Sequence, residues 1–153
     1  MTEEQTPPTR EVTYQTWLPT FEPTLGKIVR LVDVPAHELA TLSGNPRDEG
    51  TDWGLIGPWI NGATEFSVGV FTMTPNQAHP PHYHPIGPEF YYIVAGSCLL
   101  QVDHERHEAK AGTAAYLPEG TVHAVWTRDD ESVSILYAFD ERSETRVTTV
   151  WLE

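Results

Sequence analysis

Cysteine is almost absent from this sequence, which holds one, Cys98, among 153 residues. No disulfide can form within one chain, so nothing favours an oxidising compartment. Cys98 stands in an apolar, strand-like run, where we expect a buried and unreactive thiol. The N-terminal residues lack the basic and apolar regions of a secretory signal, and no apolar run approaches the ~20 residues of a membrane-spanning helix. We therefore expect a cytoplasmic protein that does not enter a membrane.

Basic residues are also scarce. Nine Lys and Arg face 22 Asp and Glu, which gives a formal net charge of -13. Such a chain repels a phosphate backbone or an anionic membrane surface at long range. We therefore expect neither nucleic acid nor acidic lipid as a partner, and we interpret the charge as a source of solubility. The partner that we expect instead is a small-molecule substrate, for the reasons given below.

Helical periodicity is rare. Residues 35–42 form the one convincing helical stretch, with Pro35 in its first turn and Gly44 just past its end. Residues 1–12 are polar, acidic and rich in Pro and Thr, so we expect a disordered tail there. The remaining residues, 13–153, fit a single domain with one core.

The sequence is instead rich in short apolar segments separated by Gly, Pro, Asn and Asp. Segments at this spacing predict an all-β sandwich or barrel. The expected strands of its main body are residues 53–59, 65–73, 90–102, 112–117, 122–127, 133–139 and 147–151. The charged residues 103–108, which include two histidines, are interpreted as a solvated connection between strands rather than as a second metal site.

Two further strands are expected near the N-terminus, at residues 12–18 and 27–32. The first of them is apolar and is separated from the barrel by a Pro-containing stretch. It could add to the sheet edge of a second copy, which predicts a homodimer. The alternative is that it packs on its own barrel.

Four side chains that can bind a metal stand at informative spacings. They occur in His82-x-His84-x4-Glu89-x6-Gly96 and in Gly112-x5-Pro118-x-Gly120-x2-His123. Because strand side chains alternate between faces, His82 and His84 point the same way. The same alternation puts Glu89, Tyr91 and Ile93 on one face, provided that no bulge interrupts the strand before residue 93.

Three imidazoles and one carboxylate suit Fe(II), Mn(II), Co(II), Ni(II) or Zn(II), and no thiolate biases the choice. Four protein ligands leave two positions open on an octahedral ion such as Fe(II). We therefore expect one divalent transition metal ion, Fe(II) first, in a site that admits a further ligand.

The two segments resemble the paired motifs of the cupin superfamily over residues 76–127. Two positions depart from the family pattern: Asn76 replaces a Gly and Thr127 replaces an Asn, and neither is a ligand position. The resemblance implies an all-β double-stranded β-helix, a jelly-roll barrel, with an N-terminal strand extension and at most one short helix. It also implies that the metal lies inside the barrel on four ligands: His82, His84, Glu89 and His123.

Residues 80–96 and 123–137 are further similar to cupin-type dimethylsulfoniopropionate lyases. Those enzymes place a Tyr two residues after the metal-binding Glu, which matches Tyr91, but they usually have three residues, not four, between the second His and the Glu. The resemblance implies that the metal acidifies a carbon of the substrate, that Tyr91 removes its proton, and that a β-substituent leaves. Because the pKa of a free phenol lies well above neutrality, the cation must lower it.

Two other functions are open to the same residues. The site also resembles cupin dioxygenases of the quercetin and acireductone kinds, in which Fe(II) binds an enolisable or phenolic substrate and dioxygen, and Tyr91 would only shape the pocket. A cupin that binds metal and ligand without turnover is the third hypothesis. In each case we expect His79 to donate a hydrogen bond or touch substrate, and we expect apolar pocket walls from Ile93, Tyr116 and Val125.

Overall fold

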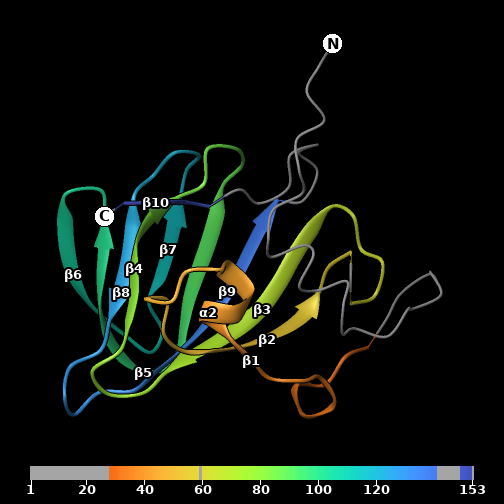
Figure 1. Cartoon of the computed structure of the whole chain (residues 1–153), viewed down its shortest axis with the longest axis horizontal. Helices are drawn as coiled ribbons and strands as arrows, with labels where there is room; N and C mark the ends of the chain where they lie inside the picture. The colour runs from red at the N-terminus through yellow and green to blue at the C-terminus, as the bar shows by residue number, and fades with distance from the viewer. Residues whose placement is uncertain (1–27, 59, 141–148, 153) are drawn as a thin grey trace.

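A computed structural model describes residues 28–58, 60–140 and 149–152, which form ten strands and two short helical segments. In chain order the elements are the 3-10 helix η1 (Leu31–Asp33), β1 (His37–Glu38), α2 (Leu39–Ser43), β2 (Thr51–Ile56), β3 (Phe66–Met73), β4 (Ala78–Tyr83), β5 (Glu89–Val102), β6 (Glu105–Lys110), β7 (Ala114–Leu117), β8 (His123–Trp126), β9 (Val133–Asp140) and β10 (Val150–Trp151) (Figure 1). The expected all-β fold with at most one short α-helix is confirmed.

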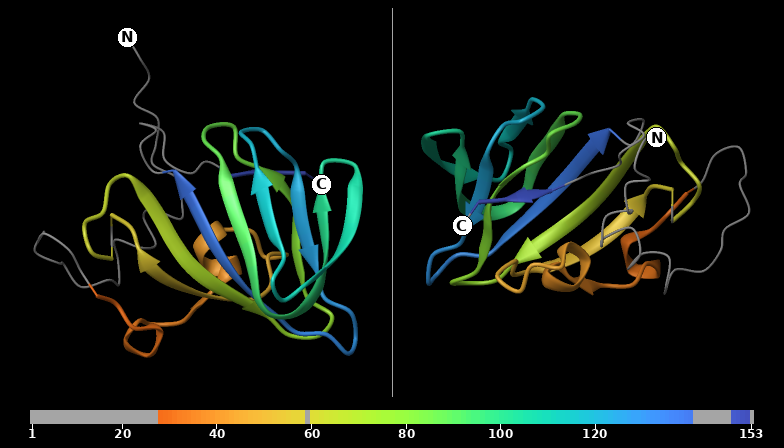
Figure 2. Two further views of the ribbon diagram at one scale, coloured as in Figure 1. Left: turned by 180° about the vertical axis from the view of Figure 1, so that it is seen from behind. Right: turned by 45° about the horizontal axis from the view of Figure 1, so that its top comes forward.

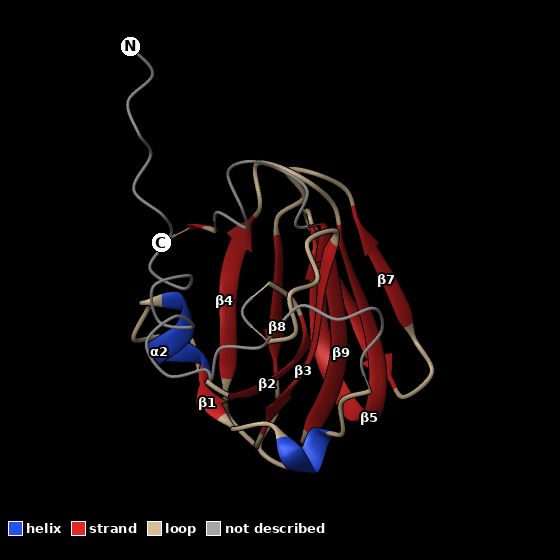
Figure 3. Ribbon diagram, turned by 90° about the vertical axis from the view of Figure 1, so that its right-hand side faces the viewer, coloured by secondary structure: helices blue, strands red, loops and turns tan. Residues whose placement is uncertain are grey.

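The strands pair antiparallel and curl around a common interior (Figure 2). One half of the sheet runs β1-β2-β3-β9-β5 and the other runs β5-β8-β4-β10, so β5 belongs to both. The first part of β5 pairs with β9 and β7, and its second part pairs with β6 and β8. Helix α2 lies outside the strands, near β1 and β4 (Figure 3), and its Leu39 joins the core. None of the helices in the described part of the chain has the length and apolar character to span a membrane.

Strand β5 keeps a regular pleat over the stretch that matters for the site. Glu89, Tyr91 and Ile93 are buried, while Phe90 and Tyr92 are exposed. The register of β5 against β9 shifts only afterwards, in a bulge between residues 93 and 95. The predicted alternation of side chains therefore holds from Glu89 to Ile93, the residues that matter for the site.

Gly96 follows this bulge, where β5 leaves β9 and continues beside β6 and β8. Its φ angle is 75°, in the left-handed region that favours glycine, and a Cβ there would overlap the carbonyl oxygen of Ser132. Gly96→Ala should therefore lower the free energy of unfolding by about 2 kcal/mol or more, because both effects add. Urea denaturation of both variants checks this, with Gly112→Ala as the control. Gly112 also has a positive φ (92°), but a Cβ there would have no atom within 4 Å. Equal losses in the two variants would rule out the overlap with Ser132.

The two departures from the cupin pattern have structural explanations. Asn76 has a φ angle of 59°, a left-handed conformation that Asn tolerates better than other non-Gly residues. The hydroxyl of Thr127 donates to the carbonyl of Thr74 at 2.6 Å and accepts from the N–H of Gln77 at 3.0 Å. Thr127 thereby fastens β8 to the turn between β3 and β4.

Three expectations were wrong or displaced. The described part of the segment at 27–32 is not a strand: Ile28 is 98% exposed and Val32 83%, and η1 begins at Leu31. The helix starts at Leu39 rather than residue 35 because β1 first pairs with β2, although it ends as predicted at Gly44 with a φ angle of 70°. Residues 105–108 belong to β6 rather than to a connection. The tail at 1–12 and the strand at 12–18 lie outside the described residues.

Cys98 is 1% exposed. Burial, with the carboxylate of Glu131 as a smaller cause, raises the pKa of its thiol to about 12. A thiol with this pKa carries almost no reactive thiolate at neutral pH, in agreement with the expected unreactive cysteine.

Candidate metal centre

Three strands bring the four predicted ligands together. His82 lies near the end of β4 with His84 two residues further on, Glu89 opens β5, and His123 opens β8. The pairing of β4 with β8 sets His82 opposite His123. All four side chains are buried, and their ligand atoms all lie within 4.8 Å of one another. This cluster can hold one metal ion.

The distances between ligand atoms fit that use. Glu89 Oε2 lies 2.9 Å from His84 Nε2 and 2.9 Å from His123 Nε2. Two ligand atoms bound at right angles to one ion, each at ~2.1 Å, stand about 3 Å apart. The four-residue connection between His84 and Glu89 therefore still lets the carboxylate reach both imidazoles.

The outer nitrogens of two rings are held by backbone carbonyls. His82 Nδ1 donates to Pro80 O at 2.7 Å, and His123 Nδ1 donates to Thr121 O at 2.9 Å. Protonated Nδ1 leaves Nε2 as an acceptor, the form that binds metal.

Buried acceptors without donors are unusual, and two of them face each other here. Neither His123 Nε2 nor Glu89 Oε2 has a hydrogen-bond partner among the described residues, although they are 2.9 Å apart. With the proton of His123 on Nδ1, both atoms offer lone pairs toward the same space. A cation is the group that satisfies such an arrangement.

The protonation states also suit a cation. Burial, with the neighbouring His79, His123 and His84, holds the pKa of His82 well below its ordinary value. Burial alone would raise the pKa of Glu89, but His84 and His123 outweigh it and hold that pKa well below its usual range. His82 is thus neutral and Glu89 ionised at neutral pH, the forms in which these two groups bind a metal.

A pH dependence of stability follows from His82. The unfolded chain protonates this imidazole below about pH 6.5, whereas the folded chain, with its lowered pKa, does not. The free energy of unfolding of the metal-free protein should therefore fall as the pH falls from neutrality toward the folded pKa. Thermal unfolding across this range checks it: His82→Gln should lose part of the decline, and His104→Gln, at an exposed turn, should keep it. An undiminished decline in His82→Gln would contradict this assignment.

The predicted neighbours Tyr91, Ile93 and Val125 are buried in the core, with exposures of 1%, 1% and 0%. The Tyr91 ring centroid lies 5.5 Å from that of His123, edge to face, and 5.6 Å from that of Phe71. Tyr91 therefore occupies the interior directly beside the metal-binding cluster.

His79 lies against the cluster and is held by a residue that the sequence did not indicate. Its ring centroid is 4.5 Å from that of His82, and its Nδ1 lies 2.5 Å from Oδ1 of Asp48. Asp48 is 1% exposed and 31 residues away in the chain. Nothing in the local pattern around Asp48 distinguishes it from a solvated acidic turn residue.

Trp151 is a second unforeseen neighbour. Strand β10 pairs with β4 and sets Trp151 opposite His82, with the two ring centroids 4.8 Å apart. Its ring also lies 5.8 Å from that of His79. The C-terminal strand was expected from its apolar residues, but its place beside the metal ligands was not.

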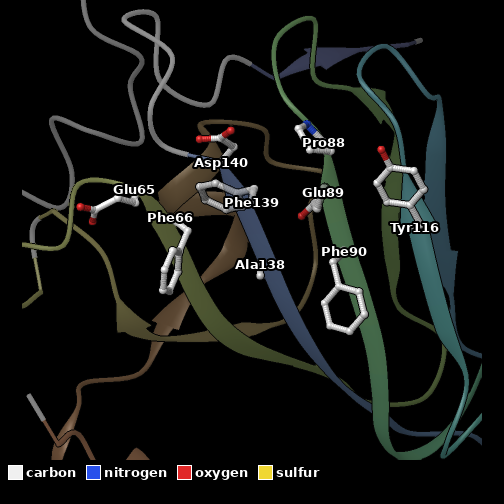
Figure 4. Close-up of a pocket in the computed structure, with 9 residues that line it drawn as sticks. All are labelled: Glu65, Phe66, Pro88, Glu89, Phe90, Tyr116, Ala138, Phe139 and Asp140. Atoms are coloured by element: carbon white, nitrogen blue, oxygen red, sulfur yellow. The ribbon is translucent and has the colours of Figure 1, made fainter.

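Tyr116 does not line the interior as expected. Its side chain is 70% exposed, and it lies opposite Phe90 on the outer face of the sheet. Residues directly opposite in an antiparallel pair share a face, and β5 turns Glu89 inward and Phe90 outward. Tyr116 instead lines a hollow of about 370 Å³ on the outside, with Phe66, Phe90 and Ala138 (Figure 4).

Comparisons with known proteins agree with this fold. A family model described as a cupin domain matches residues 69–139. The polyketide cyclase RemF from Streptomyces resistomycificus is similar in structure, with a TM-score of 0.68 and 27% identity over 84% of this chain and 88% of RemF. Protein SchB from Streptomyces halstedii is 28% identical over 111 residues, 72% of this chain and 75% of SchB. Dimethylsulfoniopropionate lyase DddW from Ruegeria pomeroyi is 32% identical over 76 residues, about half of each chain (50% and 49%).

Proposed function

Because this chain belongs to the cupin superfamily, we propose that it is a metal-dependent enzyme that removes a proton from a carbon next to a carbonyl or carboxylate group of a small substrate. The observation that carries the proposal is the buried cluster of three imidazoles and one carboxylate with a phenol beside it. Within the cluster, Glu89 Oε2 and His123 Nε2 have no hydrogen-bond partner among the described residues, and burying such atoms costs free energy unless they gain one.

The ligands in this proposal are His82, His84, Glu89 and His123. They would hold one divalent transition metal ion, with Fe(II) first and Mn, Ni, Co or Zn as alternatives. Bound there, the ion would act as a Lewis acid that polarises a substrate oxygen and makes the adjacent C–H bond more acidic. The charge of Glu89 offsets half of the charge of a divalent ion, which leaves a positive site for an oxygen ligand.

Tyr91 is the proposed base. Its ring lies edge to face with that of the ligand His123, and burial of the side chain keeps bulk water away from it. As a phenolate, Tyr91 would take the proton from the substrate carbon; the phenol so formed would return it to the alkoxide oxygen after ring closure, or to solvent where a neutral β-substituent leaves. His79, held by Asp48, is the proposed contact to the remainder of the substrate.

A poly-β-carbonyl compound is the substrate class that we favour. A carbon between two carbonyls loses its proton readily, and after this loss it can attack a further carbonyl carbon and close a ring. The similarity to the polyketide cyclase RemF, which extends over most of both chains, supports this choice. Aromatic side chains near the cluster would suit a flat unsaturated substrate: Phe71, Tyr91, Phe139 and Trp151.

β-Elimination of the dimethylsulfoniopropionate type is the second candidate. It is favoured by Tyr91, which stands two residues after Glu89 as in the lyases that the sequence resembles, and by the similarity to DddW. The two reactions share the first proton transfer and differ in the second step, which is either ring closure or departure of a β-substituent.

Anaerobic assays of the metal-loaded protein test the proposal. With a poly-β-carbonyl substrate, ring closure removes the absorbance of the 1,3-dicarbonyl group, whereas dimethylsulfoniopropionate would release a volatile sulfide detected by gas chromatography. Turnover without oxygen supports proton abstraction. Turnover that requires stoichiometric oxygen, measured with an electrode, would favour the dioxygenase hypothesis. Binding of metal and substrate without product would favour the non-catalytic one.

A further inference from the structure

The C-terminal strand β10 reaches the metal-binding cluster although it is only two residues long. It pairs with the end of β4, where Trp151 lies opposite His82, and the N–H of Leu152 donates to the carbonyl of Pro81 at 2.9 Å. In the described part of the chain β10 stands at the edge of the sheet, with β4 as its neighbour. So short an edge strand gains little stability from its own ladder, and its side-chain contacts therefore contribute much of what holds it in place.

Trp151 places an indole on one of the metal ligands. Residues directly opposite in an antiparallel pair share a face, and His82 is buried in the interior, so Trp151 also points inward. Its ring centroid lies 4.8 Å from that of His82 and 5.8 Å from that of His79. Contact with the indole restricts rotation of the His82 ring and thereby favours the orientation in which it binds a metal.

Thr149, just before β10, faces a second ligand. His84 Nε2 lies 2.9 Å from Glu89 Oε2, so Nε2 is the nitrogen directed into the cluster and Nδ1 is the outer one. The hydroxyl of Thr149 lies 3.5 Å from that Nδ1. A hydroxyl can accept from a protonated Nδ1, which keeps Nε2 available for a metal. The distance is at the long limit of a hydrogen bond, so the contact can shorten when a cation holds the ring.

His84 differs from the other two imidazoles in where this neighbour comes from. The Nδ1 atoms of His82 and His123 are held by carbonyls two residues upstream in the chain. His84 follows Tyr83, the last residue of β4, and its Nδ1 faces a residue 65 positions further along the chain. The orientation of this ligand therefore depends on where the C-terminal segment lies.

On the ligand set of the proposed function, but independently of its reaction, we propose that Thr149 and Trp151 are positioning residues of the metal centre, so that docking of β10 and binding of a metal ion stabilise each other. When β10 is docked, His82 and His84 are already oriented for the ion. When the ion is bound, the oriented rings favour docking. Such coupling is reciprocal: the factor by which docking raises the metal affinity equals the factor by which the metal raises the docking equilibrium.

Calorimetric titration with Mn(II) tests the contact of Thr149. Thr149→Val removes the hydroxyl and keeps the shape, and it should weaken Mn(II) binding about tenfold, the lower end of the range for a residue that orients a ligand. Thr149→Ser keeps the hydroxyl and should bind Mn(II) with nearly wild-type affinity. The visible absorption of the Co(II)-loaded protein, which depends on the arrangement of the ligands, should change in the Val variant and not in the Ser variant. Thr113→Val, at an exposed position beside the turn at Gly112, is the matched control and should change neither.

Hydrogen exchange of the C-terminal peptide, followed by mass spectrometry, tests the reciprocal effect. Mn(II) should slow exchange of the amides of residues 150–152 about tenfold in the wild type, and clearly less in Thr149→Val. Trp151→Ala removes the indole from His82 and should weaken Mn(II) binding to a similar extent. Trp126→Ala removes an indole that packs under Arg106 at 4.9 Å instead, and it should bind Mn(II) normally. Circular dichroism and thermal unfolding establish that each variant folds.

Equal Mn(II) affinity in the wild type and Thr149→Val, or exchange of residues 150–152 that Mn(II) leaves unchanged, would overturn the proposal. So would an equal loss of affinity in Thr149→Val and Thr149→Ser, because the hydroxyl would then not be responsible. A protein that binds metal with this dependence on Thr149 but turns over no substrate would contradict the proposed function alone. A wild type that binds no metal would contradict both.

Discussion

Replacing His123 with Ala should abolish stoichiometric metal binding and reduce turnover to background. His123 contributes one of four ligands, and its Nε2 lies 2.9 Å from Glu89 Oε2. Loss of a residue that merely orients a ligand costs 10- to 100-fold in metal affinity, so loss of a ligand should cost at least ~100-fold. Elemental analysis of purified protein and calorimetric titration with Mn(II) or Ni(II) measure this. His104→Ala, at an exposed turn, is the matched control and should bind metal normally.

Glu89→Gln separates metal binding from packing. Gln keeps nearly the same volume, so the metal-free variant should fold, while the lost charge should lower metal affinity strongly. The buried imidazoles would also lose the carboxylate that His84 and His123 face at 2.9 Å. If either variant retained one tightly bound ion per chain, the proposed ligand set would be wrong.

Tyr91→Phe should reduce turnover by roughly 10² to 10⁴, the usual contribution of a general base, with metal content unchanged. The substitution removes one oxygen and keeps the ring that packs on Phe71 and His123. The rate of anaerobic turnover and the metal content by elemental analysis are measured on the same preparation.

Tyr137→Phe is the matched control for Tyr91→Phe. Tyr137 lies directly opposite Tyr91 on β9, is 5% exposed, and stacks on Phe139 at 5.6 Å. Its hydroxyl lies over Gly69 of β3, so its removal should leave turnover within a few fold. If Tyr91→Phe kept near-wild-type turnover, Tyr91 would be a wall of the pocket, and His79 would be the next residue to test as a base.

The most successful predictions from the sequence are those that depend on the alternation of side chains within one strand. The inward positions of Glu89, Tyr91 and Ile93 follow from a period of two, and the bulge that would have displaced them begins only after residue 93. The convergence of His123 with the other ligands required the cupin resemblance, because no local rule links residues so far apart.

The positions and contacts that the sequence did not predict share a different cause, which is their dependence on tertiary pairing. The alternation of β7 restarts after the turn at Gly112, so the face on which Tyr116 lies depends on its register with β5, which the sequence does not reveal. Asp48 contacts His79 across 31 residues and belongs to no motif. The charged residues of β6 form a strand because β5 supplies a partner, and tertiary pairing outweighs their low strand propensity.

The anchoring of His82 and His123 to carbonyls two residues upstream has a practical consequence. Each ring is oriented by its own strand end, at Pro80 and Thr121, before any cation arrives. Emptying and refilling the centre should therefore leave the orientation of these two rings unchanged. The same protein loaded in turn with iron, manganese, nickel, cobalt and zinc would then allow the reactivity of each metal to be compared in the same set of protein ligands.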